Sequence, residues 1–466
     1  MSPIPQYQKI AAVIRASIKR GTLPAGSRIS SVRTLGKEHN VSALTALHAL
    51  RLLEQERWLE ARPRSGFYVM PQSVTTLSAP TSIDLVTLDQ QAATHLAIVG
   101  TPCRIRLDLA NGESGLYPTK KLGVLMRQHI YRDQDLLGDH VRGTGYPALK
   151  QQIVRRSFEY GCSIHPDELI ITNGCVESLS LALRAISRPG DAVAVESPTY
   201  FVILQMLHGL GLRPVEIAQT RQGIDLELLE QALRQYKPCA VISIANVGNP
   251  IGLTSTMDNK EALIRLAEQH GAVLIEDDIY GDTCFDASRP KPLRALSGKV
   301  ILCSGFSKTL APGIRVGWIA GGRWSPAIAL MKYTSTMGTP VYPQAAIAEF
   351  MRTGGYDLHL RRLRRTLQLQ VRRMRQAIIR HFPAGTSVSD PSGGYVLWVT
   401  LPRGCIGTRR LFERARQEGI GIAPGHLFAT DERFDHCFRL NAGFGWNDEI
   451  DSAIARLAML AVADQD

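Results

Sequence analysis

Residues 300–318 read VILCSGFSKTLAPGIRVGW, and this stretch carries the strongest indication of the fold. A short apolar run is followed by a turn rich in Ser and Gly, which presents Lys308 and Arg315. A lysine in such a turn is, taken alone, most often a surface residue. The chemistry of Lys308 therefore has to be judged from what the rest of the chain brings to it.

The apolar run at 300–302 is one of five along the chain, the others being residues 168–172, 192–195, 240–244 and 273–275. The stretches between most of them have the apolar spacing of helices. Strands that are apolar throughout are buried on both faces, and strands joined by helices run parallel. The pattern predicts an α/β domain with a mainly parallel central sheet.

Polar and aromatic residues follow each of these runs. Ligands of an open parallel sheet bind beyond the carboxyl ends of its strands, so these residues should meet in one region. The segments are, in chain order, NGCVE (173–177), ESPTY (196–200), NVGNPIG (246–252), EDDIY (276–280) and SGFSKTLAPGIR (304–315).

The residue types in these segments suit one cofactor. A lysine amine forms a Schiff base with an aldehyde. A carboxylate pairs with a pyridinium nitrogen, an aromatic ring stacks on the pyridine, and Asn and Tyr hydrogen-bond a phenolate oxygen. A helix N-terminus with Ser and Arg holds a phosphate. The sequence therefore predicts pyridoxal 5′-phosphate (PLP).

Residues from about 105 to 460 resemble a class I/II aminotransferase of fold type I. FSKTLAPGIRVGW is the most specific part of the resemblance, and EDDIY and NPIG support it. The resemblance implies a PLP-dependent transferase fold with a smaller C-terminal α+β subdomain. It also implies a homodimer, because fold type I sites form at a dimer interface.

The resemblance assigns roles to single residues. Lys308 would bind the cofactor aldehyde, Asp277 would pair with the ring nitrogen, and Tyr280 stands at the family's D-x-x-Y spacing, so these three would be catalytic. The cofactor contacts it implies are stacking by Tyr200, bonds to the phenolate oxygen from Tyr280 and Asn249, and a phosphate cradle of Gly174, Cys175, Val176, Ser307 and Arg315.

A substrate site is implied beside the cofactor. Arg439, in FRLNAG, stands where aminotransferases bind the α-carboxylate, a task that suits a guanidinium fork, and Asn111 and Gly112 would line the same place. Three positions depart from the family pattern, and the first is Cys175, where the usual Ser or Thr hydroxyl is absent. Gly305 stands where many relatives have Ser or Thr, and His140 where many have a Tyr that reaches the partner's phosphate.

The start of the chain is more basic than the rest. Residues 1–72 contain 11 Lys or Arg and 4 Asp or Glu, and so carry +7 of the net charge of +12. A basic segment beside a nearly neutral domain suggests a module that binds a polyanion, the alternative being a solubilising surface.

Helical spacing at 5–20, at 31–39 and after Ser42, which can cap a third helix, predicts a helix-turn-helix. Residues 58–62 and 67–69 read as two strands around a Gly turn, which makes a wing. The apolar side of the third helix would be supplied by Leu44, Leu47, Leu50, Leu52 and Leu53.

This segment, over about residues 7–70, resembles a GntR-type winged helix-turn-helix, on the stretch GTLPAGSRISSVRTLGKEHNVSALTALHALRLLEQERWLEARPRSGFYV. The DNA contacts that the resemblance implies are Arg33 on phosphate, Ser42, Thr45 and His48 toward the groove, and Arg64, Ser65 and Gly66 in the wing. An interaction module without DNA binding is the alternative. The whole chain resembles the MocR-type regulators, a GntR subgroup with an aminotransferase-like effector domain.

These observations predict a winged helix-turn-helix over 1–72, a linker over 73–100 with room for a short helix near 90–98, and an aminotransferase-like PLP-binding domain over 101–466. Eight Arg between 361 and 380 stand among apolar residues at helical spacing. That run favours an amphipathic helix with a solvated basic face, with a second nucleic-acid contact as the alternative.

Composition excludes several other classes of protein. No apolar run is long enough to span a bilayer, no secretion signal is visible, and no Cys or His cluster has metal-binding spacing. Eight scattered cysteines indicate free thiols in reducing cytosol.

Two functions remain open. The first is a transcription regulator that binds operator half-sites as a homodimer and senses PLP or its adduct with an amino compound. The second is an active aminotransferase with an accessory DNA-binding domain, and a pseudoenzyme without cofactor is a weaker third. The first two both need Lys308, Asp277 and Arg439. We favour the regulator, because a complete winged helix has little purpose in a metabolic transaminase.

Overall fold

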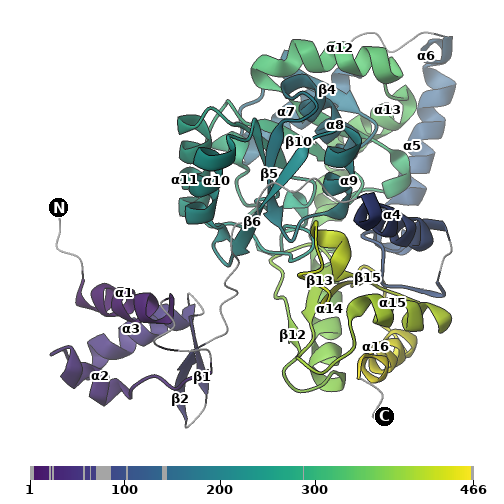
Figure 1. Ribbon diagram of the computed structural model, residues 1–466. Coiled ribbons are helices and arrows are strands. Elements are labelled where there is room, and N and C mark those ends of the chain that lie inside the picture. The colour runs from purple at the N-terminus through teal and green to yellow at the C-terminus, as the bar shows by residue number, and fades with distance from the viewer. Residues whose placement is uncertain are drawn as a thin grey trace. The chain divides into compact units, whose positions relative to one another are not determined.

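The computed structural model describes residues 5–19, 23, 26–55, 58–62, 65–69, 85–100, 103–138, 144–286 and 288–462. The chain divides into two compact units, Met1–Thr76 and Leu77–Asp466 (Figure 1). Two residues singled out from the sequence, Arg64 and His140, lie outside the described residues. None of the described helices combines the length and the apolarity that crossing a bilayer requires.

The described part of the first unit consists of three helices and a β-hairpin, which confirms the predicted winged helix-turn-helix. Its elements are α1 (Gln6–Lys19), α2 (Val32–Glu38), α3 (Ala43–Gln55), β1 (Leu59–Arg62) and β2 (Gly66–Val69). Strands β1 and β2 are antiparallel, with Leu59 opposite Val69, and both of these residues join the buried core of the unit.

Local chemistry sets the turn between α2 and α3. Asn40 has a φ of 51°, the left-handed conformation that short polar side chains tolerate. Ser42 then accepts a hydrogen bond from the Thr45 backbone N–H at 3.1 Å and so caps α3. One expectation for α3 is wrong. Leu44 is 63% exposed, because it lies in the first turn on the side away from the core.

The second unit is built on a central sheet with the strand order β4-β11-β10-β9-β8-β5-β6-β7. Strands β10, β9, β8, β5 and β6 run parallel, and β11 is antiparallel to both β4 and β10. The bounds are β4 (Leu169–Thr172), β5 (Ala192–Ser197), β6 (Arg213–Thr220), β7 (Gly223–Ile224), β8 (Ala240–Ser243), β9 (Val273–Asp277), β10 (Ile301–Gly305) and β11 (Gly317–Ala320).

Helices cover both faces of this sheet, as the apolar runs predicted. Along β5, Val193 and Val195 pack in one core with α8 and α9, whereas Ala192 and Ala194 pack in another with α10 and α11. The helices of this part are α5 (Thr119–Arg132), α6 (Asp135–Gly138), α7 (Pro147–Glu159), α8 (Cys175–Ile186), α9 (Phe201–Gly209), α10 (Leu226–Tyr236), α11 (Met257–Gln269), α12 (Ser325–Thr336) and α13 (Val341–Arg352).

A smaller α+β subdomain closes the chain, with a sheet of order β12-β13-β16-β15 (Figure 1). Its elements are α14 (Gly355–His381), β12 (Ser387–Val388), β13 (Val396–Thr400), α15 (Thr408–Gln417), β14 (Ile420–Gly421), β15 (Ala423–Pro424), η7 (Gly425–Phe428), β16 (Cys437–Asn441) and α16 (Asp448–Ala461). Strand β14 pairs with β3 (Ile105–Arg106), so the start of the unit returns to this subdomain.

Residues 85–100 differ from the expected linker, because they form a helix, α4 (Leu85–Gly100), within the second unit. Gln91 is buried, and its amide donates hydrogen bonds to the carbonyls of His426 and Ala429, both at 2.9 Å. The serine- and proline-containing composition of 71–100 suggested a linker, but Ile98 in its second half is buried in one core with Phe201 of α9 and Phe428 of η7.

Candidate functional site

Lys308 lies in the segment that joins β10 to β11. These strands are antiparallel, with Gly305 opposite Gly317, so the segment reverses the chain at the carboxyl end of β10. The Lys308 Nζ donates a hydrogen bond to the Ala110 carbonyl at 2.5 Å and lies 5.5 Å from the centroid of the Tyr280 ring. Burial, reinforced by the positive charge of Arg439, lowers the pKa of Lys308 to about 8.

Asp277 ends the neighbouring parallel strand, β9. Its Oδ1 accepts hydrogen bonds from the Cys175 thiol and from the Ile279 N–H, both at 3.2 Å. Burial raises the pKa of Asp277 to about 6, although the two hydrogen bonds favour the charged form. The two bonds fix one oxygen of this carboxylate.

Two tyrosines lie beside these charged groups. Tyr280 is buried, and its hydroxyl finds no hydrogen-bond partner among the described residues. Tyr200 immediately precedes α9, and burial raises its pKa to about 12 although Arg439 opposes that rise. Burial also raises the pKa of Tyr280, so both side chains stay neutral hydrogen-bond donors at neutral pH.

Arg439 reaches the same place from β16 in the smaller subdomain. It is 1% exposed, donates to Asn249 Oδ1 at 3.1 Å and to the Asp108 carbonyl at 2.5 Å, and burial lowers its pKa. No ion-pair partner for it occurs among the described residues, and its Nε has no hydrogen-bond acceptor there. A buried guanidinium with neutral partners and one open donor is suited to bind an anion.

The residues that the sequence predicted to hold a phosphate lie close together where β4 is followed by α8. Gly174 precedes α8 with a φ of 101°, and a Cβ there would lie 2.6 Å from an Arg315 guanidinium nitrogen, so this contact needs glycine. Arg315 donates to the Asn173 carbonyl at 2.7 Å and to Ser307 at 3.4 Å. The side chain of Val176 is 39% exposed.

Sequence reasoning missed the wall of the site opposite Lys308. The Ala110 carbonyl accepts hydrogen bonds from Lys308 and, at 3.0 Å, from the buried Tyr395 hydroxyl. Next to it, the Asn111 carbonyl accepts from Asn441 at 2.7 Å, and the Gly112 N–H donates to the Tyr117 hydroxyl at 2.8 Å. Most of these bonds use backbone atoms of a loop, which leave no signal in the side-chain pattern. Asn111 and Gly112 thus line the region, through backbone rather than side-chain groups.

Gly305 has a structural reason to be small. A Cβ there would lie 3.1 Å from the Gly317 Cα and 3.2 Å from the Val316 carbonyl oxygen. The hydroxyl that many relatives carry at this position would need β11 to move.

The predicted DNA contacts that the structure describes in the first unit are exposed or half-buried. Arg33 on α2, Ser42 just before α3 and His48 on α3 are exposed. The Ser42 and Thr45 hydroxyls lie 2.8 Å apart, and in the wing the Ser65 hydroxyl lies 2.7 Å from that of Tyr68. These bonds hold the side chains in defined positions at the start of α3 and at the hairpin turn.

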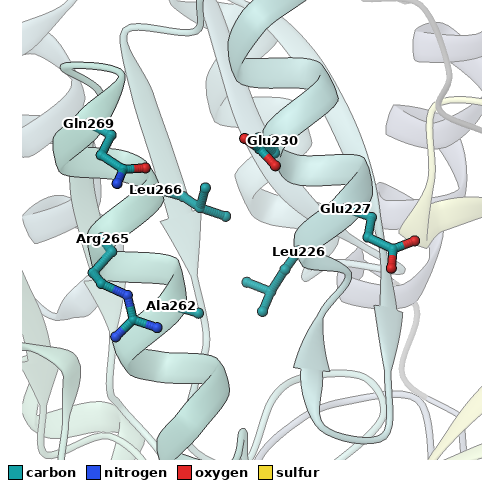
Figure 2. A pocket seen from close by; sticks show the side chains of 7 residues that line it. All are labelled: Leu226, Glu227, Glu230, Ala262, Arg265, Leu266 and Gln269. Carbon is teal, nitrogen blue, oxygen red and sulfur yellow. The ribbon is translucent and has the colours of Figure 1, made fainter. Parts of the chain in front are cut away.

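A surface groove between α10 and α11 is a separate feature (Figure 2). It is lined by Leu226, Glu227, Glu230, Ala262, Arg265, Leu266 and Gln269. It shares no residue with the candidate site and contains neither a lysine nor an aromatic side chain, so it does not suit an aldehyde cofactor.

Comparisons with known proteins agree with this geometry. The model of the class I and II aminotransferase family matches residues 113–457, and that of the gntR family of bacterial regulatory proteins matches residues 6–69. The crystal structure of kynurenine aminotransferase from Pyrococcus horikoshii in complex with PMP superposes with a TM-score of 0.74, at 26% identity, over 82% of this chain and 96% of that one.

Two relatives are similar in sequence. The uncharacterized HTH-type transcriptional regulator YdcR of Escherichia coli K12 is 34% identical over 98% of both chains. Aromatic-amino-acid aminotransferase 1 of Thermococcus litoralis is 30% identical over 73% of this chain and 84% of its own length. The second unit is therefore an aminotransferase-type domain of fold type I. The whole chain, with its gntR unit, belongs to the MocR-type family of transcription regulators.

The class I and II aminotransferase family depends on PLP, and the residues of this chain fit that cofactor. The Tyr280 hydroxyl and the Arg439 Nε are buried and have no acceptor within the described part of the chain, and an anionic ligand would supply acceptors for both. Gly174 keeps the start of α8 open beside Arg315. An amine with a lowered pKa and a buried carboxylate complete the donor set that PLP requires.

Proposed function

We propose that the protein is a DNA-binding transcription regulator whose second unit holds PLP on Lys308 and senses an amino compound there. The observation that supports this most strongly is the convergence of Lys308, Asp277 and Arg439 on one buried region, in a chain that also has a gntR unit. Pyridoxal 5′-phosphate supplies, when bound, an aldehyde for primary amines and an electron-withdrawing ring.

Each residue of the candidate site would have its own role in binding the cofactor. Lys308 would offer its amine to the aldehyde, and Asp277 would hold a proton on the ring nitrogen. Tyr280 and the amide nitrogen of Asn249 donate to the phenolate oxygen. The cofactor-binding set is completed by Tyr200 on the ring face and by Gly174, Cys175, Val176, Ser307 and Arg315 at the phosphate.

Arg439 would recognise the carboxylate of the effector. In this structure it donates to Asn249 and to the Asp108 carbonyl. A carboxylate would compete for these donors and would also reach Nε, and Asn111 and Gly112 would border it. A ligand shifts a regulator only when it binds two states with different affinity, and exchange of these contacts supplies such a difference.

An active aminotransferase with an accessory DNA-binding domain is the second candidate. The observation that favours it is the pKa of Lys308, about 8, which suits an amine that takes up and returns a proton near neutral pH. The 30% identity to an aromatic-amino-acid aminotransferase points the same way.

We further propose that the chain works as a homodimer in the cytoplasm, where operator DNA lies. The first unit would bind paired half-sites through Arg33, Ser42, Thr45, His48 and the wing residues Arg64, Ser65 and Gly66.

The test is a spectral titration of the full chain with PLP and then with a panel of amino acids and amines, run beside binding to promoter DNA at modest salt. If the protein is a regulator, only a few amino compounds will change the absorbance spectrum, and the same compounds will change the affinity for DNA. Product will not continue to form. Continued turnover with 2-oxo acids at ordinary enzyme rates, about 1–10³ s⁻¹, would establish the enzyme instead. Absence of DNA binding would overturn the regulator.

A further inference from the structure

The exposed side of α14 carries five arginines that take no part in the candidate site. Leu360, Leu363 and Leu367 of α14 are buried, as the helical spacing predicted. The opposite side, which we call the arginine face, consists of Arg361, Arg362, Arg365, Arg372 and Arg373, and all five are exposed.

The arginine face lacks counter-ions within the described part of the chain. Other arginines of the same helix are engaged: Arg375 pairs with Asp390 at 2.9 Å, Arg380 pairs with Asp451 at 2.5 Å, and Arg364 donates to the Asp282 carbonyl at 2.7 Å. Among the described residues, none of the five guanidinium groups takes part in an ion pair or a hydrogen bond; the only side-chain bond to these residues is the one that the Thr366 hydroxyl donates to the Arg362 backbone carbonyl at 3.1 Å.

The sequence spacing of the five arginines places them on one side of the helix. In a helix with 3.6 residues per turn, Arg361, Arg365 and Arg372 form one row, and Arg362 and Arg373 form the next. Residues 358–381 contain no Asp or Glu. Like charges one turn apart repel, so this arrangement costs stability unless an anion is bound.

We propose that the arginine face binds the phosphate backbone of duplex DNA that flanks the operator. The inference rests on the DNA binding proposed above. Guanidinium groups match phosphate bidentately, and the face contains arginine only and no lysine. From Arg361 to Arg373 the helix rises about 18 Å, the length of about five phosphates along one strand.

A membrane surface is the competing occupant of a basic helix. Helices that bind bilayers insert an apolar side. The apolar side of α14 is already packed in the protein core, with Leu363 and Leu367 2% and 0% exposed. Duplex DNA, by contrast, is bound by charge alone and requires no insertion.

The test uses the full chain with a binding site that the wild type has selected from random duplex. One fragment carries the minimal site, and a second carries the same site with flanking duplex on both sides. The variant replaces Arg361, Arg365 and Arg372 with Gln. The matched control replaces Arg352, Arg375 and Arg380 with Gln, which removes the same charge from arginines paired with Glu349, Asp390 and Asp451.

We expect the variant to lose at least about tenfold in affinity for the long fragment at low salt, and its slope of log K against log salt to fall by about 3, or 0.9 per phosphate. Binding of the minimal site should be unchanged, and a third variant with Lys at the three positions should keep most of the affinity. Thermal unfolding and the absorbance of the bound cofactor verify that each variant is folded.

Equal loss on both fragments, equal loss in the control, or no loss on the long fragment would each overturn the proposal. So would a loss of binding to anionic lipid vesicles with DNA binding intact, because the face would then serve a membrane. If the wild type selects no DNA at all, it is the proposed DNA-binding function that fails.

Discussion

Lys308 is held where its positive charge is disfavoured. Burial removes it from water, and Arg439 adds a second positive charge to the same region, while Asp277 offsets part of both effects. The result is an amine that is partly neutral near pH 7. A neutral amine is the nucleophile that an aldehyde requires.

Capture of PLP by the cofactor-free chain should therefore depend on pH. Below the pKa of about 8, the fraction of neutral Lys308 falls about tenfold per pH unit, so the second-order rate constant should rise with pH and level off above about 8. Stopped-flow absorbance measures this rate. Arg439→Met should move the midpoint upward, because a neighbouring positive charge is lost. A rate that rises without levelling until pH 10 would show that the amine is not perturbed.

The thiol of Cys175 has a second role to test, the positioning of Asp277. Cys175→Ala removes one donor to Oδ1 and should weaken PLP binding about fivefold, about 1 kcal/mol, whereas Cys175→Ser keeps a donor and should bind nearly as the wild type does. Cys162→Ala, at a buried cysteine outside the site, controls for the cavity. Equilibrium titration of absorbance gives the affinities. Equal affinity of the Ala and Ser variants would remove the role.

At the scale of single residues, the side chains of the candidate site could be predicted from the sequence, whereas the backbone groups that line it could not. Lys308, Asp277 and Tyr280 follow strands, and the sheet brings strand ends together whatever the details. The Ala110 carbonyl lies at the site because of the path of its loop, and the Tyr395 hydroxyl donates a hydrogen bond to it. No pattern of residue types in the sequence predicts either feature. Leu44 was predicted to lie on the apolar side of its helix because it is a leucine. In the structure it is exposed, because it lies in the first turn of α3 on the side away from the core.

At the scale of elements, α4 connects the site with the start of the second unit. His95 on α4 lies 4.9 Å from Phe201, ring centroid to centroid, and Phe201 follows Tyr200 in the chain. The Arg439 guanidinium lies 6.0 Å from the same phenylalanine ring. A shift of Tyr200 or Arg439 on ligand binding would therefore be transmitted to α4 through Phe201. Helix α4 is the first described helix after residues 70–84.

Gln91 should be the main polar anchor of α4. Gln91→Leu leaves the buried carbonyls of His426 and Ala429 without this donor, at a cost of about 1–3 kcal/mol. Denaturant unfolding followed by tryptophan fluorescence measures the free energy of unfolding. The control, Gln151→Leu on the exposed side of α7, should change it by less than about 0.5 kcal/mol. Equal effects of the two substitutions would show that α4 is not anchored there.

The strands show where pattern reasoning stops. Continuous apolar runs predicted β4, β5, β8, β9 and β10. Strand β6 was missed because its sequence, RPVEIAQT, mixes Pro and Glu with apolar residues. Its Glu216 is buried and accepts hydrogen bonds from Ser197 and Thr430, which are distant in the sequence and cannot be predicted from the local pattern. Strand β11 was missed because it begins with Gly317, which interrupts the apolar pattern.

At the scale of the whole molecule, the described residues of the second unit leave large apolar side chains exposed. Tyr131 on α5 and Leu137 on α6 are 73% and 71% exposed. Apolar groups that gather at a surface mark protein interfaces. We expect light scattering to give the mass of two chains, and the double variant Tyr131→Asp/Leu137→Asp to shift the protein toward one. A wild-type monomer at micromolar concentration would contradict the proposed dimer and, with it, the paired half-sites.

The central claim is that one amine, Lys308, carries PLP in a chain that binds DNA. Borohydride reduction of the protein loaded with PLP, followed by peptide mass spectrometry, tests it most directly. The account predicts a single phosphopyridoxyl group on the peptide that contains Lys308, and none on that peptide in Lys308→Ala. An unmodified Lys308 peptide beside modified surface lysines would contradict it.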